Sequence, residues 1–313
     1  RFEDTTWSPE ATFPYKITPD VTTYVAYKTG YKSGGFPSLS LFKLNPATPG
    51  CTTTDCRMPL GSQFGFGPET AKGFEAGFKG KFANNTIRFE ATVYSYKYSN
   101  LQQSIFDPPT FSFLIKNAAA AKIKGVELAG EWLATEGLRF NGAAAYNDAK
   151  FSSFPNNGCY TGQTVAQGCA VPPPGTVDIN GNPVVVPVQN FKGRRLPRAP
   201  KWNLMAGFTY ETAVSNDWNI GISGDVNYTS GYATQETQPP FAYQKGFALF
   251  NAGVRFFSAD NNYELAFIGR NLANKYYVQL STATTFGLSS DQLHAAAPGP
   301  REPRVLATYP VWQ

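Results

Sequence analysis

The sequence predicts an all-β protein whose long antiparallel strands form an up-and-down sheet of the transmembrane β-barrel type. Apolar and polar residues alternate with period two in one segment after another. The connections between these segments are alternately short and long, and many segments have the roughly 9–11 residues that a tilted strand needs to cross a bilayer. Aromatic residues make up 15% of the chain and charged residues only 16%.

The alternation is clearest in residues 218–228. The even positions are apolar or glycine, with Trp218 and Tyr228 at the two ends, and the odd positions are polar or glycine. A strand separates these two sets onto opposite faces, whereas a helix would mix them. Ten residue steps span about 33 Å at ~3.3 Å each. With a tilt of ~40°, this length projects to about 25 Å, the height of the apolar band of outer-membrane barrels.

The first strands follow from the same pattern and from the turns between them. Residues 12–17 and 22–30 flank TPDV, which is built from turn residues. Within the predicted strand 69–82, residues 74–82 alternate: phenylalanine, alanine or glycine at even positions and glutamate, glycine or lysine at odd positions. Residues 86–104 begin with apolar odd positions against polar even ones, after the short turn ANN. Each pair of segments therefore reads as a hairpin.

The remaining strands continue this order. ATEG joins a fifth strand to a sixth, TAVSND joins a seventh to an eighth, and SADNN joins a ninth to a tenth. An eleventh strand lies close to the C-terminus. The predicted strands from the fifth onward are 117–133, 138–150, 201–211, 218–230, 246–257, 263–271 and 303–312.

Strict alternation of short and long connections predicts that all short turns lie at one end of the sheet and all long loops at the other. A soluble β-sandwich would also alternate in hydropathy, but it usually has Greek-key connections. We therefore favour a meander in a membrane, with short periplasmic turns and long extracellular loops. The long or medium connections are 31–68, 105–116, 151–200, 231–245 and 272–302.

Composition excludes several other classes. The net charge is only +5 and Lys and Arg form no continuous run, so nucleic-acid binding is not expected. No stretch of about 18 apolar residues exists that could form a membrane-spanning helix. The first residues, RFEDTTWSPE, lack an initiator Met and the pattern of a signal peptide, so we expect the chain to be a fragment.

The four cysteines form two local pairs, Cys51 with Cys56 and Cys159 with Cys169. The single histidine, His294, is far from both pairs in sequence, so zinc binding has little support. Local disulfides in an oxidising compartment fit better, although the sequence allows three connectivities. Both pairs fall in predicted long loops, so we expect them at the same, extracellular end.

Six segments, in order, resemble TonB-dependent outer-membrane receptors. The resemblance covers nearly the whole chain and is specific to the C-terminal part of the receptor barrel. The segments are YKTGYKSGGF (27–36), PETAKGFEAGFKGKF (68–82), NAAAAKIKGVELAGEW (117–132), LPRAPKWNLMAGFTY (196–210), GRNLANKYY (269–277) and PREPRVLATY (300–309).

The resemblance implies a barrel of about 22 strands with a plugged lumen, of which our eleven strands are half. Residues 1–313 would then be the C-terminal portion of the barrel, without the plug domain. The intact protein would import a bulky nutrient, such as a ferric siderophore, across the outer membrane of a Gram-negative bacterium. Its partners would be outer-membrane lipid, lipopolysaccharide, the extracellular ligand and, through the missing N-terminal region, the periplasmic TonB complex.

Two groups of side chains are candidates for the lumen. The first group is Tyr94, Tyr96 and Tyr98, which lie at even positions of their strand, as do the charged residues Arg88 and Glu90. The tyrosines therefore point inward unless a bulge shifts the register. They could contact the plug, the aromatic girdle or the ligand, and packing is the favoured role. Asp225 and Asn227 also face inward and are weak ligand candidates.

A basic cluster lies where a long loop returns to a strand. The favoured interpretation is that this cluster is simply the solvent-exposed end of a loop. Its members are Lys192, Arg194, Arg195 and Arg198. The alternative is that Arg194, Arg195 and Arg198 contact lipopolysaccharide phosphates, because arginine suits bidentate phosphate recognition.

No catalytic, cofactor or metal site is expected. Ser290, Asp291 and His294 are too close in one loop to form a typical triad, and no glycine-rich phosphate loop leads from a strand into a helix. Two other functions remain open: a passive porin-like channel, and, with less support, a soluble glycan-binding β domain.

Overall fold

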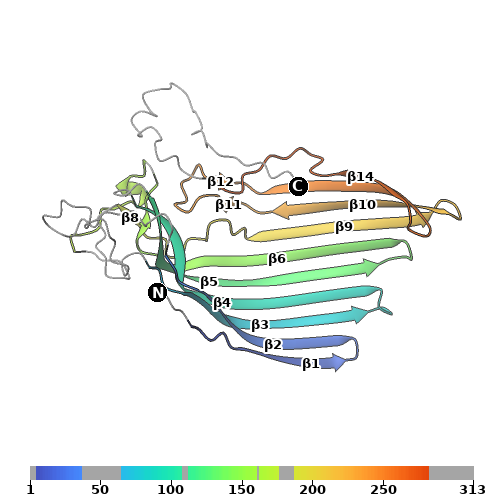
Figure 1. The fold of residues 1–313 in the computed structure, drawn as a ribbon, viewed down its shortest axis with the longest axis horizontal. Coiled ribbons are helices and arrows are strands. Elements are labelled where there is room, and N and C mark those ends of the chain that lie inside the picture. The colour runs from blue at the N-terminus through green and yellow to red at the C-terminus, as the bar shows by residue number, and fades with distance from the viewer. Residues whose placement is uncertain (1–4, 37–64, 108–111, 161, 176–186, 282–313) are drawn as a thin grey trace, which may run out of the picture.

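The structure is a computed structural model that describes residues 5–36, 65–107, 112–160, 162–175 and 187–281. These residues form one antiparallel sheet of ten strands, in the order β1-β2-β3-β4-β5-β6-β9-β10-β13-β14 (Figure 1). Each strand of the sheet therefore neighbours the next one along the chain. Two small two-stranded sheets, β7-β8 and β11-β12, lie in the connections.

The ten strands of the main sheet are long. Their bounds are β1 Glu10–Thr18, β2 Val21–Lys32, β3 Glu69–Phe82, β4 Ile87–Asp107, β5 Ser112–Leu133, β6 Leu138–Ser153, β9 Trp202–Ala213, β10 Trp218–Thr229, β13 Phe247–Ser258 and β14 Glu264–Gly269. The short strands are β7 Asn157–Gly158, β8 Val188–Gln189, β11 Tyr232–Ala233 and β12 Tyr243–Gln244, and a 3₁₀ helix, η5, covers Val165–Gln167. No helix among the described residues is long and apolar enough to cross a membrane.

All ten predicted strands up to residue 271 are present, and the predicted strand 303–312 lies outside the described residues. The largest difference is the β4–β5 hairpin, which extends from the predicted ends at 104 and 117 to Asp107 and Ser112. A bulge at Asn100, whose φ is 56°, lets the two strands stay paired beyond Tyr98. The bulge lies above the three predicted tyrosines, so it leaves their parity unchanged.

The turns and loops segregate to opposite ends of the sheet, as Figure 1 shows. The hairpin turns lie at the right-hand end and the long connections at the left. In the β3–β4 turn, Ala83, Asn84 and Asn85 all have positive φ, between 51° and 68°. Asparagine tolerates this left-handed conformation better than most residues, which explains why ANN can reverse the chain in so few residues.

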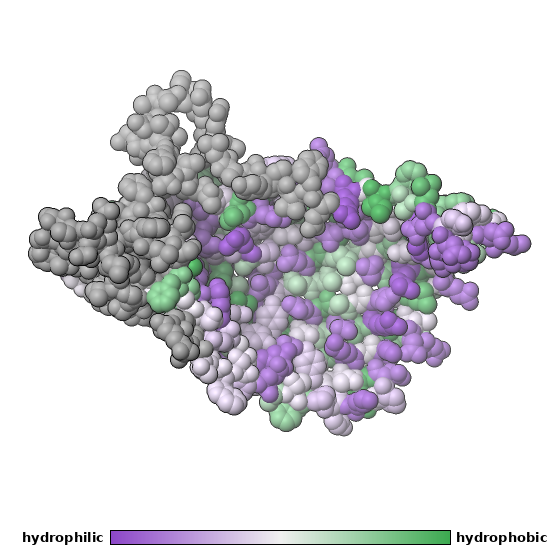
Figure 2. Space-filling view, viewed as in Figure 1, coloured by the Kyte–Doolittle hydropathy of each residue, from purple (hydrophilic) through white to green (hydrophobic). Residues whose placement is uncertain are grey.

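Period two gives the sheet two chemically different faces, named here by their side chains. The polar face carries Glu75, Tyr96, Glu131, Asp225 and Arg255, and the apolar face carries most of the exposed large hydrophobic residues of the strands. Figure 2 shows hydrophilic and hydrophobic residues interspersed along the strands on the side in view.

The apolar face is exposed to an extent that is unusual for a soluble protein. The side chain of Phe74 is 68% exposed, and many neighbours on the same face are similarly uncovered. Soluble monomers rarely expose a continuous apolar surface on this scale, because it would promote association. Other exposed members are Val25, Phe89, Val93, Val126, Leu128, Trp132, Phe140, Trp202, Leu204, Phe208, Ile222, Phe250 and Val254.

The sheet is open in the described part of the chain. β1 pairs only with β2 and β14 only with β13, so each has one free edge. Pro14 lies in β1, where a missing N–H is tolerated because the strand is at an edge. The fold is thus a ten-stranded section of wall, and closure into a barrel is not seen.

Candidate functional site

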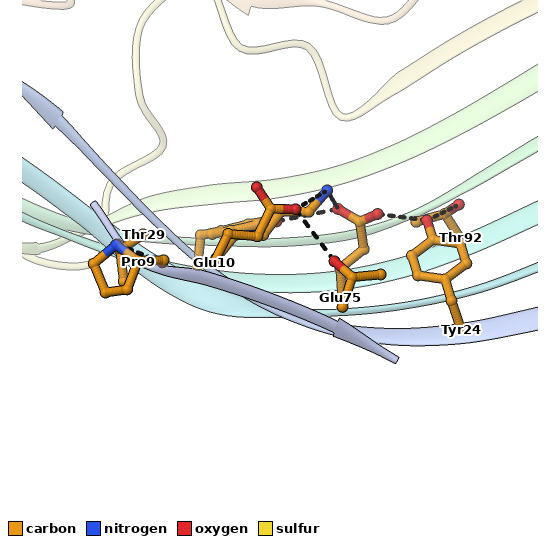
Figure 3. Close-up of polar contacts among 9 residues, drawn as sticks. Pro9, Glu10, Tyr24, Thr29, Glu75 and Thr92 are labelled. Atoms are coloured by element: carbon orange, nitrogen blue, oxygen red, sulfur yellow. Dashed lines mark hydrogen bonds and ion pairs between the residues drawn. The ribbon is translucent and has the colours of Figure 1, made fainter. Parts of the chain in front are cut away.

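The polar face is the surface on which side chains from distant parts of the sequence meet. One group centres on Glu75 of β3, which accepts a hydrogen bond from the hydroxyl of Tyr24 (Figure 3) and another from that of Tyr96. The Tyr96 oxygen lies 3.1 Å from Glu75 Oε2, and Lys28 Nζ lies 3.4 Å from the same oxygen. Only 16% of the Glu75 side chain is exposed, so the three donors replace water around its charge.

Three tyrosines of the polar face lie over glycines of the neighbouring strand. A β-carbon on Gly77 would lie 2.0 Å from the Tyr24 ring, so this glycine is needed for the tyrosine to lie flat against the wall. The direct cross-strand pairs are Tyr24 with Gly77, Tyr96 with Gly73 and Tyr94 with Gly125. The glycines fix the tyrosine rings along the sheet and bring two hydroxyls to Glu75.

The predicted tyrosines therefore take different places. Tyr96 joins the Glu75 group, and the Tyr94 ring packs 6.0 Å from that of Tyr96. Tyr98 packs against the apolar cluster beneath the loops. All three have contacts within the wall itself, and they do not converge on one binding position.

Asp225 and Asn227 lie together on the polar face of β10. Asp225 Oδ2 accepts hydrogen bonds from the amide of Asn227 at 2.6 Å and from that of Asn251 at 2.7 Å. The side-chain oxygen of Asn251 in turn accepts a hydrogen bond from the backbone N–H of Asn271 at 2.9 Å. This chain of contacts ties the segment after β14 to β13 and β10.

A hollow of about 370 Å³ lies between these two groups. Glu90, Thr92 and Glu127 line it from β4 and β5, and Asn203 and Asn227 line it from β9 and β10. The β6 residues between them are alanines, whose small side chains project little from the sheet and leave space above it. The hollow offers carboxylates on one side and amides on the other to whatever occupies the polar face.

The loop end of the sheet has its own apolar cluster. Phe191 is fully buried, between Phe151 and Phe154, and its ring centroid is 6.1 and 6.0 Å from theirs. The connection after β8 thus folds back onto the upper strands. The cluster is completed by Leu101, Ala119 and Ala121, with Tyr98, Ala118 and Leu196 at its margin.

Polar contacts join the long connections to one another. The buried amide of Gln189 donates to the carbonyls of Gly158 at 2.9 Å and Thr237 at 3.2 Å, and its oxygen accepts from Gln163 at 2.9 Å. The hydroxyls of Thr234 and Ser281 lie 2.7 Å apart in a buried contact. The described residues of the connections 154–201, 230–246 and 270–281 therefore form one packed unit, which we call the loop cluster.

A disulfide joins Cys159 and Cys169 within the loop cluster, with 5.8 Å between the two Cα atoms. The other predicted pair, Cys51 and Cys56, lies outside the described residues, as do Ser290, Asp291 and His294. No group of three metal-ligating side chains occurs among the residues that the structure describes.

The three predicted arginines have separate contacts. Arg198 pairs with Glu236 at 2.8 Å, across two connections. Burial raises the pKa of the Glu236 carboxyl, and the nearby Arg198 charge opposes that shift. Arg194 lies over the Phe191 ring at 4.6 Å, and Arg195 donates to the carbonyl of Asn147 at 2.8 Å.

Sequence reasoning missed Tyr24, Glu75 and Gln189. Tyr24 and Glu75 are 51 residues apart, so only the strand register brings them together. Glu75 and Lys79 are both at odd positions of the same strand, so the sequence already indicates that Glu75 lies on the polar face. Nothing in the sequence indicates which residues contact it.

Solved structures share this fold at low sequence identity. The ferric yersiniabactin uptake receptor FyuA from Yersinia pestis matches with a TM-score of 0.59 and 14% identity, over 88% of this chain and 34% of that one. The siderophore receptor PiuA from Acinetobacter baumannii has a TM-score of 0.56 and 18% identity, over 87% of this chain and 32% of that one. The copper transporter OprC matches with a TM-score of 0.54 and 15% identity, over 87% of this chain and 34% of that one.

The chain thus spans about a third of the length of these solved structures. No curated protein matches it significantly in sequence. The family model described as TonB dependent receptor-like, beta-barrel matches residues 1–272, most of the chain. Together with the meander and its two unlike faces, this match shows that the chain belongs to the TonB-dependent receptor family, as part of its β-barrel.

Proposed function

We propose that this chain is part of the barrel wall of an energy-coupled outer-membrane receptor that imports a bulky nutrient, with a ferric siderophore as the expected ligand. In this proposal residues 1–313 form the C-terminal portion of the barrel, and a plug domain and the contact with TonB belong to the rest of the receptor. The apolar face meets lipid and the polar face lines the lumen.

The observation that carries the proposal is the contrast between the two faces of one long-stranded meander. Phe74, exposed on one face, is adjacent in sequence to Glu75, which three side chains hold on the other. A wall between lipid and a filled, wet lumen needs both properties in the same strands. The hollow between β4 and β10 gives that lumen a surface on which a folded plug could rest.

The loop cluster supports a receptor rather than an open channel. Its connections are joined by the Gln189 contacts, the Phe191 cluster and the Cys159–Cys169 disulfide. Such a packed unit at the extracellular end can hold binding groups in fixed positions, which reduces the entropy lost on binding a ligand.

The ligand class rests on the solved structures of similar fold, because they include a ferric yersiniabactin uptake receptor and a siderophore receptor. Another of these structures, OprC, is a copper transporter, so the cargo has to be tested directly. The wall itself offers carboxylates, amides and tyrosine hydroxyls, which suit a polar organic chelate and do not select one.

A growth assay tests the proposal. The complete receptor containing this chain is expressed in a receptor-null strain, which is grown under iron limitation with individual ferric siderophores, and in parallel under copper limitation. We expect one ferric siderophore to restore growth, and the rescue to disappear in a strain that lacks TonB. Rescue by copper alone would contradict the ligand class.

The same strains distinguish an energy-coupled receptor from a passive porin. Uptake that persists without TonB, and that extends to small solutes of many kinds, would contradict an energy-coupled receptor. Recovery of the protein outside the outer-membrane fraction would contradict both membrane functions and favour a soluble binding domain.

A further inference from the structure

We propose that five basic side chains on the apolar face form a binding site for lipopolysaccharide phosphates in the outer leaflet. The side chains, called here the basic row, are Lys72, Lys97, Lys122, Lys150 and Arg195. The proposal depends on the outer-membrane location proposed above and is independent of the imported ligand.

The strand register places these residues side by side. Lys72 of β3 is paired with Lys97 of β4, and Lys97 with Lys122 of β5. Lys122 is paired with Lys150 of β6, and an isolated bridge continues the row from Lys150 to Arg195. Directly opposite residues share a face of the sheet. With about 4.8 Å between strands, the row is roughly 19 Å long.

The row lies on the apolar face at a defined height. Lys72 and Phe74 are two positions apart on β3, so they share that face, and Phe74 is exposed. A second row of direct partners lies near the turn end: Phe82, Ile87, Trp132 and Phe140.

The two rows are ten residues apart on each of four strands, from Phe82 to Lys72 on β3 and from Trp132 to Lys122 on β5. Ten residues cover about 33 Å of strand, or about 25 Å of height when the strand is tilted by ~40°. This is the height of the apolar band of an outer-membrane barrel. The basic row therefore lies at the outer-leaflet headgroups, where lipid phosphates begin.

The positive charge of the row is largely uncompensated within the described part of the protein. Asp148 lies 3.0 Å from Lys150 and 3.9 Å from Arg195. Among the described residues Lys72, Lys97 and Lys122 have no ion pair. Like charges directly opposite one another destabilise a sheet, so a row of this kind needs anions beyond those that the described residues supply.

Lipid phosphates satisfy this need better than dissolved ions. They are concentrated at the level of the row, and their acyl chains lie against the apolar face below it. A row of about 19 Å exceeds the reach of one phosphate, which favours a headgroup with several phosphates, such as that of lipopolysaccharide. The site differs from the sequence-predicted arginine cluster, because Arg198 is already paired with Glu236 and Arg195 alone belongs to the row.

The test uses the complete receptor with the substitutions Lys72→Gln, Lys97→Gln, Lys122→Gln and Lys150→Gln. A matched control removes four cations of the polar face: Lys16→Gln, Lys79→Gln, Lys81→Gln and Arg88→Gln. Each protein is purified in detergent and titrated with lipopolysaccharide, dephosphorylated lipopolysaccharide, phosphatidylglycerol and inorganic phosphate. A milder variant, Lys97→Gln with Lys122→Gln, is included in case the fourfold variant fails to fold.

We expect the fourfold variant to bind lipopolysaccharide at least about tenfold more weakly, since each lysine near an anionic surface contributes measurably. The control should bind like the unmodified receptor, and dephosphorylation should abolish the difference. Equal lipopolysaccharide affinity in both variants would overturn the proposal, as would an equally strong effect on phosphatidylglycerol or free phosphate. Outer-membrane fractionation of all variants separates failure of this site from failure of the membrane location itself.

Discussion

At the scale of single residues, Glu75 is a carboxylate that three side chains of neighbouring strands hold on the polar face. Replacing Glu75 by Gln keeps its shape but removes the charge that Tyr24, Tyr96 and Lys28 contact. Hydrogen bonds to a charged group are worth about 1.5–3 kcal/mol, and partial exposure reduces this. We expect the free energy of unfolding of the complete receptor to fall by about 1–2 kcal/mol, measured by urea unfolding in lipid vesicles.

Glu90 provides the control for this change. It also lies on the polar face, but its side chain is 56% exposed and its ion pair with Lys79 is 3.5 Å long. Exposed pairs contribute little, so Glu90→Gln should change the free energy of unfolding by less than about 0.5 kcal/mol. Equal effects of the two substitutions would show that Glu75 has no special structural role.

Glu236 gives the loop cluster a dependence on pH. Burial raises the pKa of its carboxyl above the unfolded value, although Arg198 opposes the shift. A raised pKa means that the folded cluster holds this proton more tightly than the unfolded chain does. The contribution of Glu236 to stability is therefore full below the unfolded pKa and is lost as the pH rises through the folded pKa.

We expect amides in residues 231–245 to be better protected at pH 5 than at pH 7.5, in hydrogen exchange corrected for intrinsic rates. In Glu236→Gln this pH-dependent difference should shrink, because glutamine does not titrate. A pH dependence that stays unchanged in that variant would assign the effect to other groups.

At the scale of the elements, period two predicted the ten strands of the main sheet. The pattern works in β10 because each residue faces either the apolar or the polar side, with no third environment. It could not predict β7, β8, β11 and β12, which have two residues each and depend on tertiary contacts such as those of Gln189. The upper end of the β4–β5 hairpin, residues 105–107 and 112–116, was not predicted, although the predicted strand 86–104 already passes the bulge at Asn100.

The candidate site was less predictable than the strands. Parity placed Tyr96 and Asp225 on the polar side, but their partners come from other strands. Glu75 reaches Tyr96 over 21 positions, and Asp225 reaches Asn251 over 26. The basic row shows the same limit, because its five members come from separate segments, whereas the predicted arginine cluster was visible as neighbours in sequence.

The tyrosine–glycine pairs lead to a prediction for β2 and β3. A β-carbon at Gly77 would lie 2.0 Å from the Tyr24 ring, whereas one at Gly30 would have no atom within 4 Å. Gly77→Ala must displace Tyr24 from Glu75, and such overpacking costs about 1–3 kcal/mol. Gly30→Ala should be close to neutral. Urea unfolding of both variants measures the difference, and a neutral Gly77→Ala would contradict the pairing.

The Cys159–Cys169 disulfide leads to a prediction for the loop cluster. The bond closes a loop with a sequence separation of 10, so its loss should cost the cluster about 2–3 kcal/mol through chain entropy. In Cys159→Ser with Cys169→Ser, we expect faster proteolysis between β6 and β9 and an unchanged urea midpoint for the barrel. Loss of the barrel itself would show that the loops and the wall fold as one unit.

At the scale of the whole molecule, the described sheet has two free edges, on β1 and β14. An unpaired backbone N–H or C=O in the hydrocarbon layer costs several kcal/mol, so an open sheet is not viable there. We expect residues 1–313, exported alone in a receptor-null strain, to restore no uptake and to lack the heat-modifiable mobility of a closed barrel. The complete receptor, in the same strain, should show both. Uptake by the exported chain alone would contradict the proposal that it is one section of a larger wall, because the missing strands would then be unnecessary for closure.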